Sequence, residues 1–131
     1  MKLLGQLPRP VNELKVAVLG LTFKENVPDL RNSKVPDIIQ ELREYGVQVL
    51  VHDPIAEPKE AVEEYGIHLS KWDDLSDIDG IIVAVAHREF ADMGLQKLLK
   101  PLRNQREGVV IDVKCLLDQA KLPKTLKYWR L

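Results

Sequence analysis

The stretch GIIVAVA at residues 80–86 is apolar without a polar residue in it. A strand with one face in water alternates apolar and polar side chains, so an unbroken apolar run predicts a strand covered on both faces. KVAVLG at 15–20 and GVVIDV at 108–113 are further short apolar runs of strand length. Strands of this kind are typical of a parallel sheet that lies between two layers of helices.

Segments with helical character separate these runs. Helices are predicted at 34–46, at 57–66 and from Glu89 to about Leu102, and a glycine ends each of the first two. In the first of them the apolar side chains fall on one helical stripe, formed by Val35, Ile38, Ile39, Leu42 and Tyr45.

Further strands are predicted at 47–54 and at the edge of the sheet at 126–131, with a brief one at 67–69. Strands that alternate with helices of about ten residues form βαβ units. The sequence therefore predicts an α/β fold, a three-layer, Rossmann-like arrangement around a mostly parallel, doubly wound sheet of about five or six strands. We expect one domain at 14–131, preceded by a linker or arm at 1–13, which contains two prolines and keeps no helical or strand period.

Composition excludes several kinds of site. The chain has 131 residues, of which 45% are hydrophobic, and a net charge of -1, so it has no overall field for binding nucleic acid or an anionic membrane. It has a single cysteine and three histidines without metal-site spacing, so we expect no internal disulfide and no metal. No apolar run reaches the roughly 18 residues of a membrane span. We expect a soluble, cytoplasmic domain with no nucleic-acid or membrane partner.

The segment LGLTFKENVPDLRNS at 19–33 leaves the first predicted strand and ends where a helix begins. In open α/β sheets, ligands bind at the carboxyl ends of the strands, and a helix N-terminus favours an anion. The loop lacks the glycines that let a backbone approach a phosphate closely, but it carries Lys24 and Arg31. It therefore indicates an anion held by side chains. The alternative is that both cations are solvated or paired with Glu25 and Asp29.

Five segments together carry a resemblance to a known family: LGLTFKENVPDLRNS at 19–33, VLVHDP at 49–54, AVAHREF at 84–90, IDVKCLLD at 111–118 and YWRL at 128–131. From about Lys15 to Leu131 the chain resembles the C-terminal, UDP-binding domain of the UDP-glucose/GDP-mannose dehydrogenase family. Within that family it most resembles the bacterial members that oxidise UDP-N-acetylhexosamines for surface polysaccharides.

The resemblance implies an NAD-dependent oxidoreductase that converts the C6 hydroxyl of a UDP-sugar to a carboxylate in two hydride transfers. In the family an N-terminal domain binds most of the NAD, a cysteine outside this domain forms a covalent intermediate, and the parent enzyme is a homo-oligomer. The sequence contains neither GxGxxG nor that cysteine segment. We therefore expect a fragment with no catalytic residue and no activity of its own, which needs the N-terminal and central domains. A stand-alone, non-catalytic nucleotide-binding module is the alternative.

The resemblance also assigns roles to single residues. Phe23 and Lys24 match a pair that contacts the nucleotide-sugar, Lys24 through a phosphate or ribose oxygen and Phe23 by shaping the pocket. Arg31 matches an arginine that approaches the NAD pyrophosphate. Lys114 stands where glucose-oxidising members have an arginine that grips the substrate, which keeps the charge and loses the bidentate geometry. Asp29 is expected to orient Arg31.

Other residues invite a functional role that we do not assign. Cys115 is the only thiol but lacks the motif of the family's nucleophile, and Asp53 is better explained by an Asp-Pro turn than by a ribose contact. For His87, a capping or structural role and a place facing the site both remain open. Ser33 is expected to cap the following helix, and Trp129 to pack into the domain.

Overall fold

The computed structural model describes residues 10–104, 107–113 and 116–130. One five-stranded sheet forms its centre, with the order β2-β1-β3-β4-β5 and every neighbouring pair parallel. The predicted α/β class and the strand number are thereby confirmed. The strands are β1 (Lys15–Leu19), β2 (Gln48–His52), β3 (Gly80–Val83), β4 (Val109–Asp112) and β5 (Lys127–Arg130).

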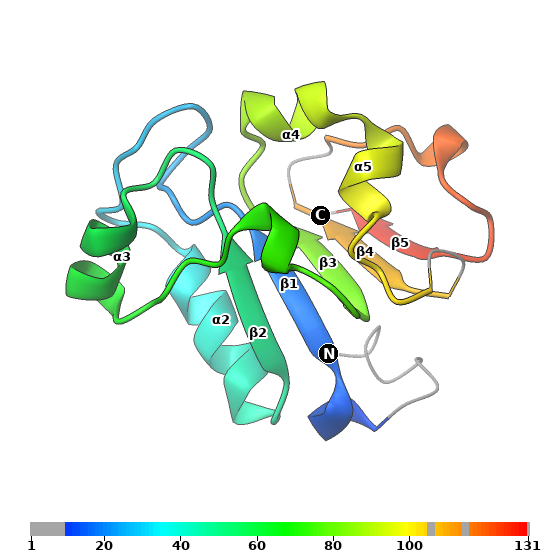
Figure 1. The fold of residues 1–131 in the computed structure, drawn as a ribbon, viewed down its shortest axis with the longest axis horizontal. Coiled ribbons are helices and arrows are strands. Elements are labelled where there is room, and N and C mark those ends of the chain that lie inside the picture. Colours follow the sequence, from blue (N-terminus) through cyan, green and yellow to red (C-terminus); the bar gives the residue numbers. More distant parts are fainter. Residues whose placement is uncertain (1–9, 105–106, 114–115, 131) are drawn as a thin grey trace.

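Helices connect the strands and cover both faces of the sheet (Figure 1). Neighbouring residues of β1 point to opposite faces: Val16 and Val18 join the core on one side, whereas Ala17 and Leu19 join the core on the other. Within the described residues the α-helices are α2 (Val35–Glu44), α3 (Pro58–Tyr65), α4 (Arg88–Met93) and α5 (Leu95–Leu99). The first core contains side chains of α2 and α3 and the second contains those of α4 and α5, so the three-layer prediction is correct.

Short 3-10 helices complete the described elements. They are η1 (Val11–Glu13), η2 (Trp72–Asp74) and η3 (Gln119–Lys121). Most of the predicted arm at 1–13 lies outside the described residues, and its last three residues form η1, which leads into β1. Within the part of the chain that the structure describes, no helix is long and apolar enough to cross a membrane.

Three local predictions were wrong. The single helix expected from Glu89 to Leu102 is broken into α4 and α5 at Gly94, whose φ of 83° lies outside the helical region. The brief strand at 67–69 is reduced to one bridge between Leu69 and Val51. Trp129 is 53% exposed because it lies on the edge strand β5.

Candidate functional site

The loop after β1 begins at the point where the direction of the chain across the sheet reverses. From β1 the chain moves to one neighbour, β2, and then crosses back to the other neighbour, β3. Ligands of open α/β sheets bind at such a switch point, outside the carboxyl ends of the strands. In Figure 1 the loop after β1 and helix α4 lie at the same edge of the sheet, toward which the strand arrowheads point.

Gly20 is the first residue of this loop and is needed there for two reasons. Its φ of 97° is a conformation that side chains disfavour. A Cβ atom on Gly20 would also lie 2.6 Å from the Cβ of Val85, in the turn that follows β3. The loop can therefore leave β1 only because residue 20 has no side chain.

The buried carboxylate of Asp53, at the end of β2, holds the main chain of the loop by hydrogen bonds. Oδ2 of Asp53 accepts hydrogen bonds from the backbone N–H groups of Leu21 (2.7 Å) and Thr22 (3.2 Å). Oδ1 accepts from the N–H groups of Ile55 and Ala56, each at 2.9 Å. The prediction of a simple Asp-Pro turn was therefore incomplete. Asp53 closes that turn and also holds the start of the loop after β1.

His87, which follows β3 and immediately precedes α4, contacts both Asp53 and the loop after β1. Nε2 of His87 lies 2.9 Å from Oδ2 of Asp53 and 3.1 Å from the hydroxyl of Thr22. Nδ1 of His87 accepts a hydrogen bond from the N–H of Asn26 at 3.0 Å. The side chain of His87 is fully buried, which decides for the structural role and against direct contact with a ligand.

Burial raises the pKa of Asp53, but the hydrogen bonds from His87, Leu21 and Ile55 outweigh it and lower the pKa to about 2. The carboxylate is therefore ionised at neutral pH, although its side chain has no exposed surface. A buried charge of this kind is stable only because so many donors converge on it.

The two side chains expected to touch the nucleotide-sugar lie on the outside of this fixed loop. Phe23 is 54% exposed and Lys24 is also exposed. Their main chain is held all the same: the N–H of Phe23 donates to the carbonyl of Asp29 at 2.8 Å, and the Thr22 hydroxyl donates to the carbonyl of Lys24 at 3.0 Å. Phe23 and Lys24 are therefore presented to solvent from a main chain that is fixed by hydrogen bonds.

Ser33 ties the far end of the loop to its beginning. Its hydroxyl donates to the carbonyl of Leu21 at 2.7 Å and accepts from the N–H of Val35, the first residue of α2, at 3.2 Å. The expected capping contact is therefore present, although the residue at the cap position itself is Lys34.

Arg31 is paired with Asp29, as expected. Its Nε and Nη2 donate to the two carboxylate oxygens at 3.1 Å and 3.4 Å, and 80% of its side chain is exposed. The side-chain hydrogen bond lowers the pKa of Asp29 and raises the pKa of Arg31 from their ordinary values. Asp29 thus occupies one edge of the guanidinium, and Nη1 is left for another acceptor.

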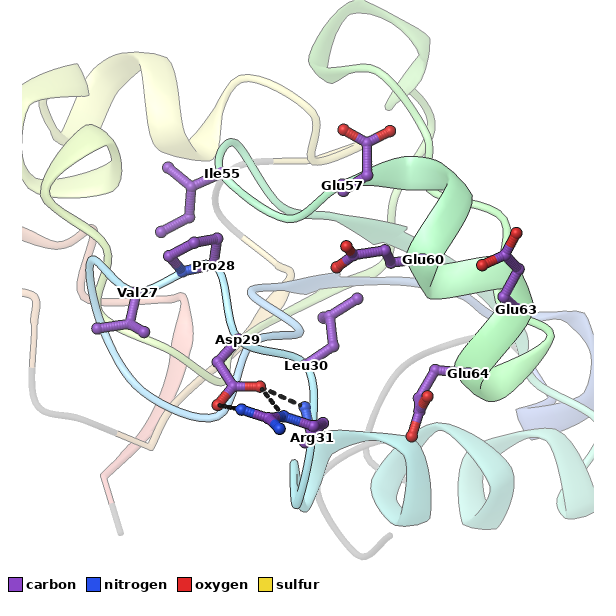
Figure 2. A pocket seen from close by; sticks show the side chains of 10 residues that line it. All are labelled: Val27, Pro28, Asp29, Leu30, Arg31, Ile55, Glu57, Glu60, Glu63 and Glu64. Atoms are coloured by element: carbon purple, nitrogen blue, oxygen red, sulfur yellow. Dashed lines mark hydrogen bonds and ion pairs between the residues drawn. The ribbon is translucent and has the colours of Figure 1, made fainter.

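Arg31 lies in a groove of about 720 Å³ between the loop and α3 (Figure 2). Glu57, at the N-terminal cap of α3, and three glutamates within α3 line the groove. Figure 2 shows the side chain of Glu60 turned toward the loop. Sequence reasoning missed these carboxylates as neighbours of Arg31, because they lie about 30 residues away along the chain. The lining residues are Val27, Pro28, Asp29, Leu30, Arg31, Ile55, Glu57, Glu60, Glu63 and Glu64.

Lys114 and Cys115 lie outside the described residues. Among the residues that are described, no group of three or more histidine, cysteine, aspartate or glutamate side chains could hold a metal ion. Asp112, at the end of β4, is fully buried. Its carboxylate accepts hydrogen bonds from the N–H groups of Leu116 and Leu117 and from the hydroxyl of Tyr128.

The model of the UDP-glucose/GDP-mannose dehydrogenase family, UDP binding domain, matches residues 17–119. The chain belongs to this family. A UDP-N-acetyl-D-glucosamine 6-dehydrogenase from Pseudomonas aeruginosa is 48% identical over 111 residues, which are 85% of this chain and 26% of the relative. Protein CapL from Staphylococcus aureus is 40% identical over 118 residues, which are 88% of this chain and 27% of that protein.

Solved structures of similar proteins share the fold. A UDP-D-ManNAc dehydrogenase from Pyrococcus horikoshii superposes with a TM-score of 0.76 at 23% identity, over 98% of this chain and 28% of that one. A UDP-glucose dehydrogenase from Pyrobaculum islandicum gives a TM-score of 0.63 at 30% identity, over 98% and 26%. The chain thus spans about a quarter of the length of these relatives. The suggested resemblance to this family and the Rossmann-like fold are both confirmed.

Proposed function

We propose that this domain binds the UDP-sugar of an NAD-dependent UDP-sugar 6-dehydrogenase, which oxidises the C6 hydroxyl of a UDP-N-acetylhexosamine to a carboxylate for surface polysaccharide synthesis. Family membership supports the reaction class, and the name of the relative from Pseudomonas aeruginosa supports the hexosamine. The observation that carries the proposal is the loop at the switch point, whose buried main chain presents Phe23 and Lys24 to solvent.

In this role Lys24 reaches a phosphate or ribose oxygen as a compact positive charge. Phe23 forms the apolar wall beside it, against which a flat ring can lie. Lys114 completes the set with a second positive charge toward the sugar or phosphate. The chain itself supplies no catalytic residue in this proposal: it binds and orients the nucleotide while other domains supply the nucleophile and most of the NAD site.

Among the described residues, we assign Arg31 to the cofactor. Its Nη1 is free to approach the NAD pyrophosphate, but the glutamates of α3 make the rest of the groove unfavourable for an anion. The loop also has no glycine-rich turn of the kind that cradles a dinucleotide. We therefore assign one contact with NAD to this domain and the remaining contacts to an N-terminal domain. As part of the same proposal, the whole enzyme is cytoplasmic and a homo-oligomer.

Titration calorimetry of the 131-residue chain with UDP-N-acetylglucosamine and with uridine tests the binding role. Loss of a charge-assisted hydrogen bond costs about 1.5–3 kcal/mol, so Lys24→Ala should raise the Kd for the UDP-sugar roughly tenfold to a hundredfold. The affinity of this variant for uridine, which has the ribose but no phosphate, should stay unchanged if Lys24 contacts a phosphate and should fall if Lys24 contacts the ribose.

Lys100→Ala is the matched control. Lys100 is exposed and lies beside Pro101, whose carbonyl bonds Ile78 near the amino end of β3, at the opposite edge of the sheet. Equal affinities in the wild type, Lys24→Ala and Lys100→Ala would refute the binding role. The alternative, a stand-alone nucleotide-binding module, predicts the same binding of the UDP-sugar. It differs from the enzyme hypothesis in that a full-length protein would form no NADH.

A further inference from the structure

The loops after β1, β2 and β3 meet at one buried pair, formed by Asp53 and His87. Neither side chain has exposed surface, so neither can touch a ligand of the domain directly. Both nevertheless hold the main chain of the loop after β1: Asp53 accepts from the N–H groups of Leu21 and Thr22, and His87 accepts from the N–H of Asn26. The pair therefore acts on the main chain of residues 21–26 and not on a ligand.

The hydrogen-bond directions around His87 follow from its partners. The N–H of Asn26 can only donate, so Nδ1 of His87 must be the unprotonated acceptor. The ring proton then sits on Nε2 and points at the carboxylate of Asp53, 2.9 Å away. The hydroxyl of Thr22 donates to the carbonyl of Lys24 and turns its oxygen toward Nε2. Each donor of this network has an acceptor, so one arrangement of the loop is specified.

The loop needs this support because its conformation is not intrinsically favoured. Asn26 has a φ of 62°, in the left-handed region that non-glycine residues adopt only a few per cent of the time. Its N–H is held by His87, and its side-chain oxygen accepts from the N–H of Arg88 at 2.8 Å. Asp53 fixes the other end, at Leu21 and Thr22. Between these anchors lie only three residues, 23–25, and all three are exposed.

We propose that His87 and Asp53 are positioning residues for the nucleotide ligand, which fix the main chain of residues 21–26 so that Phe23 and Lys24 are in place before the ligand arrives. This inference rests on the proposed function of the loop. A loop ordered in advance loses less conformational entropy on binding than a mobile one, so the pair contributes to affinity without touching the ligand.

Two substitutions of His87 each keep half of its bonds. In His87→Gln the side-chain amide reaches about as far as Nε2 and can donate to Asp53, but nothing accepts from the N–H of Asn26. In His87→Asn the shorter side chain can accept from Asn26, and Asp53 loses its donor. His52→Gln is the matched control, because it changes a ring that also contacts Phe90, at 6.1 Å between centroids, but whose described hydrogen bond goes to the carbonyl of Ser70 at 2.9 Å and not to the loop.

Amide hydrogen exchange, followed by NMR on the full chain without ligand, reports the state of the loop. In His87→Gln the Asn26 amide should exchange at least tenfold faster, whereas His87→Asn should retain much of its protection. His52→Gln should leave it as in the wild type. Wild-type exchange at Asn26 in His87→Gln would overturn the proposal.

Coupling to Lys24 separates positioning from a general loss of stability. If the pair places Lys24, the factor by which Lys24→Ala raises the Kd for UDP-N-acetylglucosamine should be at least threefold smaller in the His87→Gln background. A merely structural role leaves that factor unchanged, and this result would refute the positioning role while Lys24 keeps its own. If the wild type does not bind the UDP-sugar, the proposed function fails and the inference fails with it.

Should His87→Gln not fold, His87→Asn gives a second test of the pair. It takes the donor away from Asp53, whose carboxylate holds Leu21 and Thr22 just before Phe23. The penalty of Lys24→Ala should again shrink in this background, and an undiminished penalty would overturn the inference.

Discussion

Replacing Asp53 by asparagine should destabilise the domain far more than the loss of one charge suggests. Five donors converge on this carboxylate: four backbone N–H groups and the Nε2–H of His87. An asparagine offers one oxygen and one NH2 group. With its oxygen in the place of Oδ2 it still accepts from the loop after β1 and from His87, but its NH2 group faces the N–H groups of Ile55 and Ala56.

The magnitude follows from this count. Even in the better orientation, the buried N–H of Ala56 and the partly buried N–H of Ile55 lose their acceptor, at about 1–3 kcal/mol each, so the free energy of unfolding should fall by about 2–6 kcal/mol. The same hydrogen bonds lower the pKa of this carboxylate to about 2, against the usual 3.8. At about 1.4 kcal/mol for each pKa unit this difference corresponds to about 2–3 kcal/mol of stabilisation by the ionised form.

The pH dependence has a definite sign. Because the folded-state pKa of Asp53 is below its unfolded-state value, the stabilisation is complete above about pH 4. It is lost as the pH falls from about 4 to about 2, as the carboxylate takes up a proton. The Asp53→Asn variant should lack this part of the acid dependence.

Urea unfolding at pH 7 and at intervals down to pH 3, followed by far-UV circular dichroism, measures both effects. Asp73→Asn is the control, since Asp73 is exposed and such substitutions change stability by no more than about 0.5 kcal/mol. A loss below about 1 kcal/mol at pH 7, or an unchanged acid dependence in Asp53→Asn, would show that Asp53 does not hold the three loops.

Three further outcomes are expected. Gly20→Ala should cost about 2–5 kcal/mol of unfolding free energy, because it adds left-handed strain to a 2.6 Å contact with Val85, whereas Gly66→Ala, with the same sign of φ and open space, should cost about 1–2 kcal/mol. Urea midpoints that are equal in the two variants would contradict this. In the full-length enzyme, Arg31→Ala should raise the KM for NAD roughly tenfold or more and leave the KM for the UDP-sugar unchanged; a rise in both would remove the assigned contact. Lys114→Arg should weaken UDP-sugar binding although the charge is kept, and Lys114→Met should weaken it at least as much, by a factor that shrinks as salt rises; calorimetry at two ionic strengths would show wild-type affinity in both if Lys114 is not in the site.

Most of the fold could be predicted from the sequence because the signals are local. The unbroken apolar runs gave the buried strands, and the glycines at 46 and 66 gave the ends of two helices. The break at Gly94 was missed because Phe90 and Leu98 face the same core on both sides of it, so the apolar stripe continues across two separate helices. The periodic pattern reports the buried face and not the continuity of the backbone.

The place of the loop after β1 in the fold could be predicted, but the hydrogen bonds that hold it could not. The place of the loop after β1 follows from the strand order, and the exposed Phe23 and Lys24 are consistent with the expectation from the family. The contact between Asp53 and His87 joins residues 34 positions apart and depends on the alignment of strand ends. Considered singly, each residue had an ordinary local explanation. Both follow strands next to β1, and this shared position was the signal that could have paired them.

The central place of β1 has a consequence for how the domain assembles during synthesis. Its partner β2 follows soon in the chain, but Val16 pairs on the other side with Gly80, more than 60 residues later. Until β3 has been made, β1 presents one open, apolar strand edge, which can pair with other chains. At about 5–20 residues per second, the roughly 30 residues between the ends of β2 and β3 leave this edge open for about 2–6 s. The loop after β1 is completed later still, once residue 87 has been made, so the UDP-sugar that we propose as its ligand cannot guide the folding of the first half of the domain.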